Sequence, residues 1–258
     1  MENIKLQFLG TCACDFSPKL KNEFKYCFDN DARRSSSLLV NDNVLIDCGI
    51  HTLESLDILK IPYEQITDVI ITHTHDDHYI PENIEKIAKN RHSPLRLWIR
   101  DGARTPQNEN IEVIKMNLLT KHEKYGITVT GLPANHDQRT FPQHLLLEFG
   151  EKKLYYACDG AWIMCEALNY LRGSNLCAIV LDATVGDYEG DYRAAEHNSI
   201  PMIRQLLPTL KTNKIISEKT KVFLSHIAPS LHKPHKEIVK SVINDGIDVA
   251  YDGLVTEI

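Results

Sequence analysis

The stretch that decides the fold runs from residue 68 to residue 78 and reads DVIITHTHDDH. Its first five residues are a compact, β-branched run, which predicts a buried strand that leads directly into His73. His73 and His75 are two residues apart, so an extended backbone would point both imidazoles to the same side. Asp77 and His78 are adjacent and would diverge toward a second position. Because imidazole and carboxylate together suit zinc, manganese or iron, the segment predicts a metal site, with a solvated turn as the alternative.

Four more aspartate or histidine residues follow strand-like runs elsewhere in the chain. They are Asp47 in LIDCG, His136 in NHD, Asp159 in ACDG and His226 in LSH. Taken alone, each has a plainer interpretation. Asp47 could simply form a turn, and Asp159 could form a turn or cap a helix. His136 could lie in a surface loop, and His226 could be a hydrogen-bonded residue of the core. The strand that precedes each of them is what makes them candidates for the same site.

Together these five motifs resemble those of the metallo-β-lactamase superfamily, and the resemblance spans about residues 4 to 252. It implies an α/β fold, a four-layer αββα sandwich, with metals at one edge between the two sheets. We expect a single domain over residues 1–258, because no linker or repeat interrupts the chain. The segments GT at 10–11, RRSSS at 33–37 and FLSHI at 223–227 are most similar to the phosphoribosyl cyclic phosphate phosphodiesterases. These enzymes and the tRNA 3′-processing ribonucleases belong to the phosphodiesterase branch of the superfamily.

The resemblance also implies a set of metal ligands for two divalent ions, zinc or manganese, with iron as a further option. It assigns one ion to His73, His75 and His136, and the other to Asp77, His78 and His226. Asp159 would bridge the two ions, and Asp47 would accept a hydrogen bond from a ligand imidazole. Two such ions with a bridging hydroxide between them form a hydrolytic nucleophile, so Asp77 is also a candidate catalytic residue.

His197, just before an expected helix start, is the second candidate catalytic residue. Once the seven ligands are assigned, its imidazole is available to protonate a leaving alkoxide or to neutralise charge on a phosphoryl oxygen. An exposed loop histidine is the alternative. Arg33 and Arg34 are candidates for binding a substrate phosphate, although a pair of arginines is more often a solvated face.

These residues predict a metal-dependent hydrolase, a phosphodiesterase that acts on a small or cyclic phosphate ester through a metal-bridging hydroxide. A carbonyl-ester, lactone or β-lactam hydrolase on the same site is the alternative, because the same hydroxide attacks a carbonyl group equally well. A non-catalytic metal-binding protein is a further alternative. The sequence names neither the substrate, the metal nor the oligomeric state, and a homodimer is compatible with it.

Composition narrows the classes of partner. The chain has 258 residues, 43% of them hydrophobic and 25% charged, with a net charge of −6. That charge argues against broad binding of duplex DNA. Only 22 residues separate His136 from Asp159, and no long arm rich in glycine and proline is visible, so large structured RNA is a poor substrate candidate. An odd number of cysteines, seven, and the absence of a signal peptide or a long apolar run favour the cytoplasm over a membrane.

Cysteine spacing gives one further expectation. Related cyclic phosphodiesterases often hold a structural zinc on a compact cysteine cluster near the N-terminus. Here Cys12, Cys14 and Cys27 are widely spaced, so we expect this additional zinc to be missing. Whether these cysteines bind anything else is not fixed by the sequence.

The remaining pattern predicts short strands that alternate with helices. We expect helices at 52–59, at 81–88 with Pro81 in the first turn, around 163–171, after the cap Ser199 and after Pro234, with Pro208 bending or ending the fourth. The loop 186–192 is expected to be an acidic solvated loop, and His232 and His235 surface residues at a helix start, although one of these histidines could enter the substrate pocket. The strands are expected at 4–8, 37–40, 44–46, 68–72, 95–99, 111–116, 127–132, 145–149, 154–157, 178–181 and 222–225.

Overall fold

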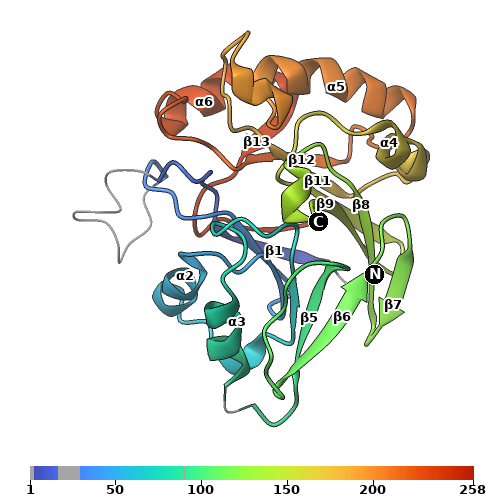
Figure 1. Cartoon of the computed structure of the whole chain (residues 1–258). Coiled ribbons are helices and arrows are strands. Elements are labelled where there is room, and N and C mark those ends of the chain that lie inside the picture. Colours follow the sequence, from blue (N-terminus) through green and yellow to red (C-terminus); the bar gives the residue numbers. More distant parts are fainter. Residues whose placement is uncertain (1–2, 17–29, 90) are drawn as a thin grey trace.

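The computed structural model describes residues 3–16, 30–89 and 91–258, and it places their strands in two seven-stranded sheets (Figure 1). The first sheet contains, in spatial order, β14 (Val255–Glu257), β1 (Lys5–Gly10), β2 (Ser37–Val40), β3 (Val44–Ile46), β4 (Asp68–Ile70), β5 (Leu95–Arg100) and β6 (Ile111–Met116). The second contains β13 (Ile247–Val249), β12 (Lys221–Ser225), β11 (Ala178–Asp182), β10 (Lys152–Ala157), β9 (Gln143–Phe149), β8 (Ile127–Pro133) and β7 (Lys121–Lys124).

Helices cover the outer face of each sheet. In Figure 1, α4 (Cys165–Leu171), α5 (Ile200–Thr212) and α6 (His235–Val242) lie at the top, and α2 (Thr52–Ile58) and α3 (Pro81–Ala88) lie at the lower left. Three apolar clusters separate these layers. One packs α2 and α3 on the first sheet, one fills the space between the sheets, and one packs α4, α5 and α6 on the second sheet. The expected αββα sandwich is therefore confirmed.

The core between the sheets follows from strand periodicity. Leu6, Phe8 and Ile46 of the first sheet share one buried cluster with Tyr156 and Phe223 of the second. The rings of Phe8 and Phe223 pack with their centroids 5.4 Å apart. Alternate residues of a strand point to opposite faces, so the neighbouring residues of these strands pack against the helices instead.

Some helix and strand expectations need correction. Ser199 caps α5 as expected, and its hydroxyl accepts the Met202 N–H, but the helix continues through Pro208 to Thr212. Its apolar face, which includes Ile203 and Leu210, stays buried along the whole length, and this packing outweighs the single hydrogen bond that proline removes. Strand β7 was not expected, because its sequence KHEK has no apolar alternation.

Strand direction explains why the predicted ligands meet. β3 and β4 run parallel, and so do β10, β11 and β12, which brings the carboxyl ends of these strands to one edge of the sandwich. The residues that follow those ends are Asp47, His73, Asp159 and His226, with Asp182 as the last residue of β11. The edge where such strands end is the usual place for a ligand site in α/β proteins.

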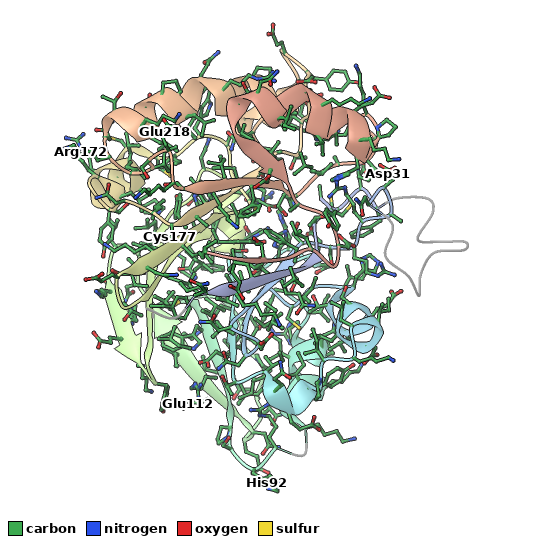
Figure 2. The ribbon with its side chains drawn as sticks, turned by 180° about the vertical axis from the view of Figure 1, so that it is seen from behind. Asp31, His92, Glu112, Arg172, Cys177 and Glu218 are labelled. Carbon is green, nitrogen blue, oxygen red and sulfur yellow. The ribbon has the colours of Figure 1, made fainter. Side chains whose placement is uncertain are left out.

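Charged side chains lie on the outside of both halves of the sandwich. Viewed from behind, Glu112 lies on the part of the molecule that holds the first sheet, whereas Arg172 and Glu218 lie near the helices over the second (Figure 2). Glu218 belongs to the segment after α5, and Lys211 in the last turn of α5 pairs with it at 3.0 Å. In the part of the chain that the structure describes, no helix has both the length and the apolar character that a membrane crossing requires.

Candidate metal centre

Three of the predicted ligands form a first cluster. His73 Nε2 lies 3.0 Å from His75 Nδ1, and His136 Nε2 lies 3.1 Å from the same His75 atom. His73 and His75 come from the segment after β4, whereas His136 follows β8 in the other sheet. A tetrahedral zinc ion with Zn–N bonds of about 2.0–2.1 Å holds its ligand nitrogens about 3.3 Å apart. The donor types and their spacing therefore fit a shared cation.

A second cluster lies beside the first. Nε2 of His78 is 3.2 Å from Nε2 of His226, 3.4 Å from an Asp77 carboxylate oxygen and 3.3 Å from an Asp159 oxygen. All four side chains are buried. The outer nitrogen of His78, Nδ1, donates a hydrogen bond to Asp47 Oδ2 at 2.7 Å. In the neutral imidazole, Nε2 therefore carries no proton and presents its lone pair. Lone pairs and carboxylate oxygens that face one another in this way call for a cation between them.

Asp159 connects the two clusters. Its Oδ2 lies 3.0 Å from His226 Nε2 and 3.7 Å from His73 Nε2, while Oδ1 faces His78. Burial raises the pKa of Asp159, but the positive charges that His226, His78 and His73 carry when protonated outweigh burial and hold that pKa well below its usual range. A carboxylate that stays ionised between two ligand clusters suits a bridging position.

Asp47, expected to accept a hydrogen bond from an imidazole, lies against His78. Its carboxylate is fully buried, and it accepts from His78 and from the Thr72 main-chain N–H at 2.8 Å. Burial raises the pKa of Asp47, and the neighbouring His78 opposes that rise. By accepting from one ring nitrogen of His78, Asp47 leaves the other nitrogen for a metal.

His197 lies beside both clusters. Its ring centroid is 5.1 Å from that of His136 and 5.5 Å from that of His226, and its Nδ1 lies 2.7 Å from Asp182 Oδ2. Burial lowers the pKa of His197, but the Asp182 carboxylate outweighs burial, so the pKa is raised. The side chain is only 16% exposed, so the alternative of an exposed loop histidine is wrong. Asp182 and His197 also approach Asp159 and His226 at ligand spacing, but a hydrogen bond already joins the first two.

The loop that carries Asp159 is held by a histidine that the sequence did not single out. His144 on β9 is buried, and its Nε2 donates to the Asp159 main-chain oxygen at 3.0 Å. Its Nδ1 accepts from the Tyr155 hydroxyl at 2.8 Å. A Cβ atom on Gly160 would lie 2.6 Å from His144 Nε2, so only glycine allows this close approach. His144 therefore fixes the main chain at Asp159.

A pocket of about 620 Å³ opens over the two clusters. Phe16 and Ile50 give part of its wall an apolar surface, and the Phe16 ring meets His51 edge-on at 4.4 Å. Among the described residues that line the pocket, Arg193 is the one arginine or lysine, and Asp191 holds its guanidinium through two hydrogen bonds of 2.9 and 2.8 Å. The pocket thus offers a volume with an apolar side, several carboxylates and one arginine whose guanidinium is paired with Asp191.

Arg33 and Arg34 do not belong to this pocket. Both are buried, which excludes the solvated face that the sequence favoured. Arg33 donates to the Thr11 hydroxyl and to the Ala250 main-chain oxygen, each at 2.6 Å. Arg34 donates its main-chain N–H to Asp252. The expectation that these two arginines contact a substrate phosphate is corrected, because the pocket is lined without them and their contacts join the N- and C-terminal parts of the fold.

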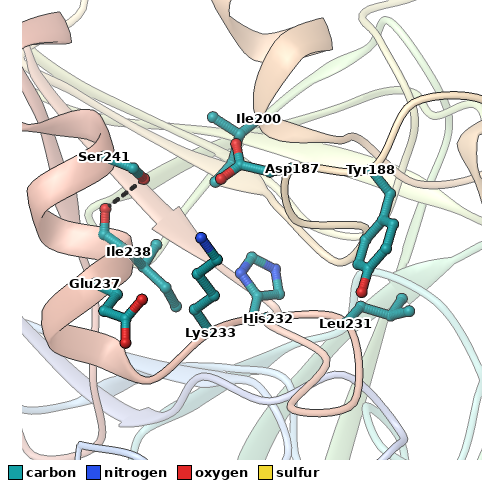
Figure 3. A pocket seen from close by; sticks show the side chains of 9 residues that line it. All are labelled: Asp187, Tyr188, Ile200, Leu231, His232, Lys233, Glu237, Ile238 and Ser241. Atoms are coloured by element: carbon teal, nitrogen blue, oxygen red, sulfur yellow. Dashed lines mark hydrogen bonds between the residues drawn. The ribbon is translucent and has the colours of Figure 1, made fainter.

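A second cavity, of about 360 Å³, lies between α6 and the loop that precedes α5 (Figure 3). In the close view His232 lies near its centre, between Lys233 and Tyr188. The Nε2 of His232 donates to the Ala183 main-chain oxygen at 2.6 Å, so His232 lines this cavity and not the metal pocket. His235, expected at the surface, is buried with its Nδ1 3.0 Å from Arg33. Tyr188 is the member of the 186–192 loop whose ring borders the cavity.

Two cysteines of the expected N-terminal group are described. Cys12 is buried, and Cys14 is exposed and borders the metal pocket. Partial desolvation of the Cys14 thiol, followed by the charge of Asp77, raises its pKa. Cys27 lies outside the described residues, so the missing structural zinc stays a prediction.

Three residues that complete the site were missed from the sequence. Asp182 ends a strand-like run in the same way as Asp47 and Asp159, and that shared position could have identified it. Thr184 follows in the same segment and contacts His226. His144 sits inside a strand and no local pattern distinguishes it, because its partner Asp159 is brought close only by the fold.

Comparison with known proteins adds a family match over the first third of the chain. A family model described as anti-Pycsar protein Apyc1 matches residues 5–92, a range that includes Asp47 and the ligand segment 73–78. A relative with that description, from Bacillus phage 010DV004, is 26% identical over 148 residues. The match covers 45% of this chain and 57% of the phage protein, so the chain spans little more than half of that relative.

Solved structures match nearly the whole chain. The metallo-β-lactamase fold protein YhfI from Bacillus subtilis has a TM-score of 0.75 at 16% identity, with 99% of this chain and 100% of that chain covered. A diphosphatase from the PhnP family has a TM-score of 0.75 at 20% identity, covering 100% and 98%. Zn²⁺-bound PqqB from Methylobacterium extorquens has a TM-score of 0.74 at 17% identity, covering 98% and 100%. This chain therefore has the metallo-β-lactamase fold, which confirms the expectation from its motifs.

Proposed function

We propose that this chain is a dinuclear metal-dependent phosphodiesterase that acts on a small or cyclic phosphate ester. The observation that carries the proposal is the pair Asp182–His197, joined at 2.7 Å and packed against His136 and His226 of the two ligand clusters. An alkoxide leaves a phosphodiester with difficulty unless it receives a proton, and His197 is placed to supply one. The structural likeness to a PhnP-family diphosphatase also supports phosphorus as the centre attacked.

The ligand set supports two divalent ions, zinc or manganese, with iron as a further option, because nitrogen and oxygen ligands accept all three. His73, His75 and His136 would hold one ion, and Asp77, His78 and His226 the other, with Asp159 between them. When bound, such a pair lowers the pKa of a shared water and withdraws charge from a phosphoryl oxygen. The zinc in the structural neighbour PqqB supports zinc as the first metal to test.

The protein's own groups would then perform three tasks. Asp182 holds His197 by Nδ1, which leaves Nε2 as the ring nitrogen that donates a proton to the leaving oxygen. Arg193 supplies a positive charge at the pocket wall for an anionic part of the substrate. His144 keeps the Asp159 main chain in place during turnover.

Substrate size and location belong to the same proposal. A pocket of about 620 Å³ suits a small-molecule ester better than structured RNA. We place the protein in the cytoplasm, as its cysteine content favours. A homodimer is compatible with this proposal and is not required by it.

The experiment is a metal-dependent screen that compares bis-p-nitrophenyl phosphate, cyclic nucleotides, a lactone and a β-lactam, with Asp77→Ala as the matched variant. We expect turnover of the phosphodiesters and its loss in Asp77→Ala, because that substitution removes a ligand of the second cluster. Turnover of the lactone or the β-lactam alone would favour the carbonyl alternative. Metal binding without turnover of any substrate would favour the non-catalytic alternative.

A further inference from the structure

Two buried carboxylates at the site share an arrangement. Asp47 and Asp182 each form a hydrogen bond with one imidazole, and each reaches a second imidazole through a threonine hydroxyl. Both carboxylates are fully buried and lie on the protein side of the ligand clusters. The two threonines, Thr72 and Thr184, are buried as well. The arrangement therefore occurs twice, once at the end of each sheet.

In the first sheet the hydroxyl is that of Thr72. Its Oγ1 lies 3.0 and 2.9 Å from the two Asp47 oxygens and 3.1 Å from Nδ1 of His73. An ionised carboxylate only accepts, so the hydroxyl proton points at Asp47 and the hydroxyl oxygen is left to accept from His73. Nδ1 of His73 then carries the ring proton, and Nε2, the atom that faces His75 and Asp159, is a lone pair.

In the second sheet the hydroxyl is that of Thr184. Its Oγ1 lies 2.7 Å from Asp182 Oδ1 and 2.8 Å from Nδ1 of His226. The His226 main-chain oxygen, at 3.0 Å, is a second acceptor for the same hydroxyl proton. With either acceptor the hydroxyl oxygen accepts from His226 Nδ1–H, and Nε2 of His226 is left as the lone pair that faces Asp159. The Thr184 main-chain N–H also donates to Asp182 at 2.8 Å and so fixes the threonine itself.

We propose that Thr72 and Thr184 are positioning residues that set the tautomers of His73 and His226, so that the Nε2 lone pair of each ring is directed at the metal ions. The inference rests on the proposed function, because it concerns ligands of the proposed ions. A ring without this hydroxyl is free to place its proton on Nε2, and that tautomer cannot bind a metal through Nε2. Loss of a hydrogen-bond partner behind a metal ligand typically weakens metal affinity about 10–100-fold.

Each threonine has a matched pair of substitutions. Thr184→Val keeps the shape of the side chain and removes only the hydroxyl, whereas Thr184→Ser keeps the hydroxyl. Thr72→Val and Thr72→Ser form the second pair. The full-length protein is stripped with a chelator, and Zn²⁺ affinity and stoichiometry are then measured by competition with a chromophoric chelator. Circular dichroism of the metal-free variants checks that they are folded.

We expect the valine variants to bind one or both ions about 10–100-fold more weakly than the wild type, and the serine variants to bind within a few-fold of it. A valine variant that binds both ions like the wild type overturns the inference. If the wild type binds no divalent ion, the proposed function fails instead, so the two failures are distinguishable.

A second measurement remains decisive if a valine variant does not fold. In the zinc-loaded wild type, NMR of the histidine ring nitrogens identifies which nitrogen binds zinc and which keeps its proton. A protonated Nδ1 on both His73 and His226 is the expected result. A bond to zinc through Nδ1 of either ring overturns the inference.

Discussion

Replacing His197 separates the proposed acid from the metal ligands. His197 is held by the buried Asp182, which raises the pKa of the imidazole and favours the protonated form that an acid needs. General acid catalysis contributes about 10²–10⁴-fold in rate, which corresponds to about 3–5 kcal/mol of transition-state stabilisation. We expect His197→Ala to lose that factor in kcat/KM on a diester with an alkoxide leaving group. On bis-p-nitrophenyl phosphate, whose leaving group needs no proton, the loss should be under about tenfold.

The assay compares kcat/KM for the two diesters in wild type, His197→Ala and the control His92→Ala, a substitution at an exposed position that does not line the metal pocket. Metal content is measured on the same samples, because His197 lies near the second cluster. Full stoichiometry with a selective loss on the alkoxide diester is the expected result. Equal activity of His197→Ala and wild type on that diester would refute the acid role, and loss of an ion would make His197 a ligand.

Three further perturbations test other parts of the molecule. Asp159→Ala should lower metal stoichiometry below two per chain while the metal-free fold persists; elemental analysis that still finds two ions would remove its bridging role. His144→Gln can still donate to the Asp159 main-chain oxygen, whereas His144→Leu cannot, so only the leucine variant should lose metal affinity, measured by chelator competition. Burial raises the pKa of Asp252 to about 6, above about 3.9 in the unfolded chain, so its contribution to stability is complete below about pH 4 and is lost as the pH rises through 6. The free energy of unfolding in urea is measured on the metal-free proteins from about pH 4 to pH 7. Over this range the wild type should lose about 3 kcal/mol of stability relative to Asp252→Asn. A difference between the two proteins that does not change with pH would contradict the raised pKa.

The motifs predicted the fold and pointed to the residues that gather in the two clusters, because both depend on local pattern. A strand that ends in His73 or His226 is visible in the sequence, and parallel strands bring such ends together. The positions of Arg33 and Arg34 were not predictable in this way. Their partners, such as Ala250 and Asp252, lie more than two hundred residues away, and a charged pair in sequence carries no sign of such burial.

The residues that line the pocket walls also could not be predicted from the sequence. Phe16 and Arg193 have ordinary neighbours along the chain, and only tertiary packing brings them over the same ligands. His144 shows the same limit inside a strand, since alternation predicts an inward face there but not a hydrogen bond to Asp159. Asp182 is different, because its place at a strand end was a signal that could have been used.

Each ligand cluster draws side chains from both sheets: His73 and His75 come from one rim and His136 from the other, and Asp77 and His78 face His226 across the same seam. A cation held there would act as a clasp that fastens the two halves of the sandwich along an edge otherwise closed by loops. Because the metal would bind only the folded protein, its binding free energy would add to the stability of the fold. Free metal at a thousand times its dissociation constant would add about 4 kcal/mol to the free energy of unfolding. Starvation for the metal would then threaten the persistence of the protein in the cell as well as its turnover.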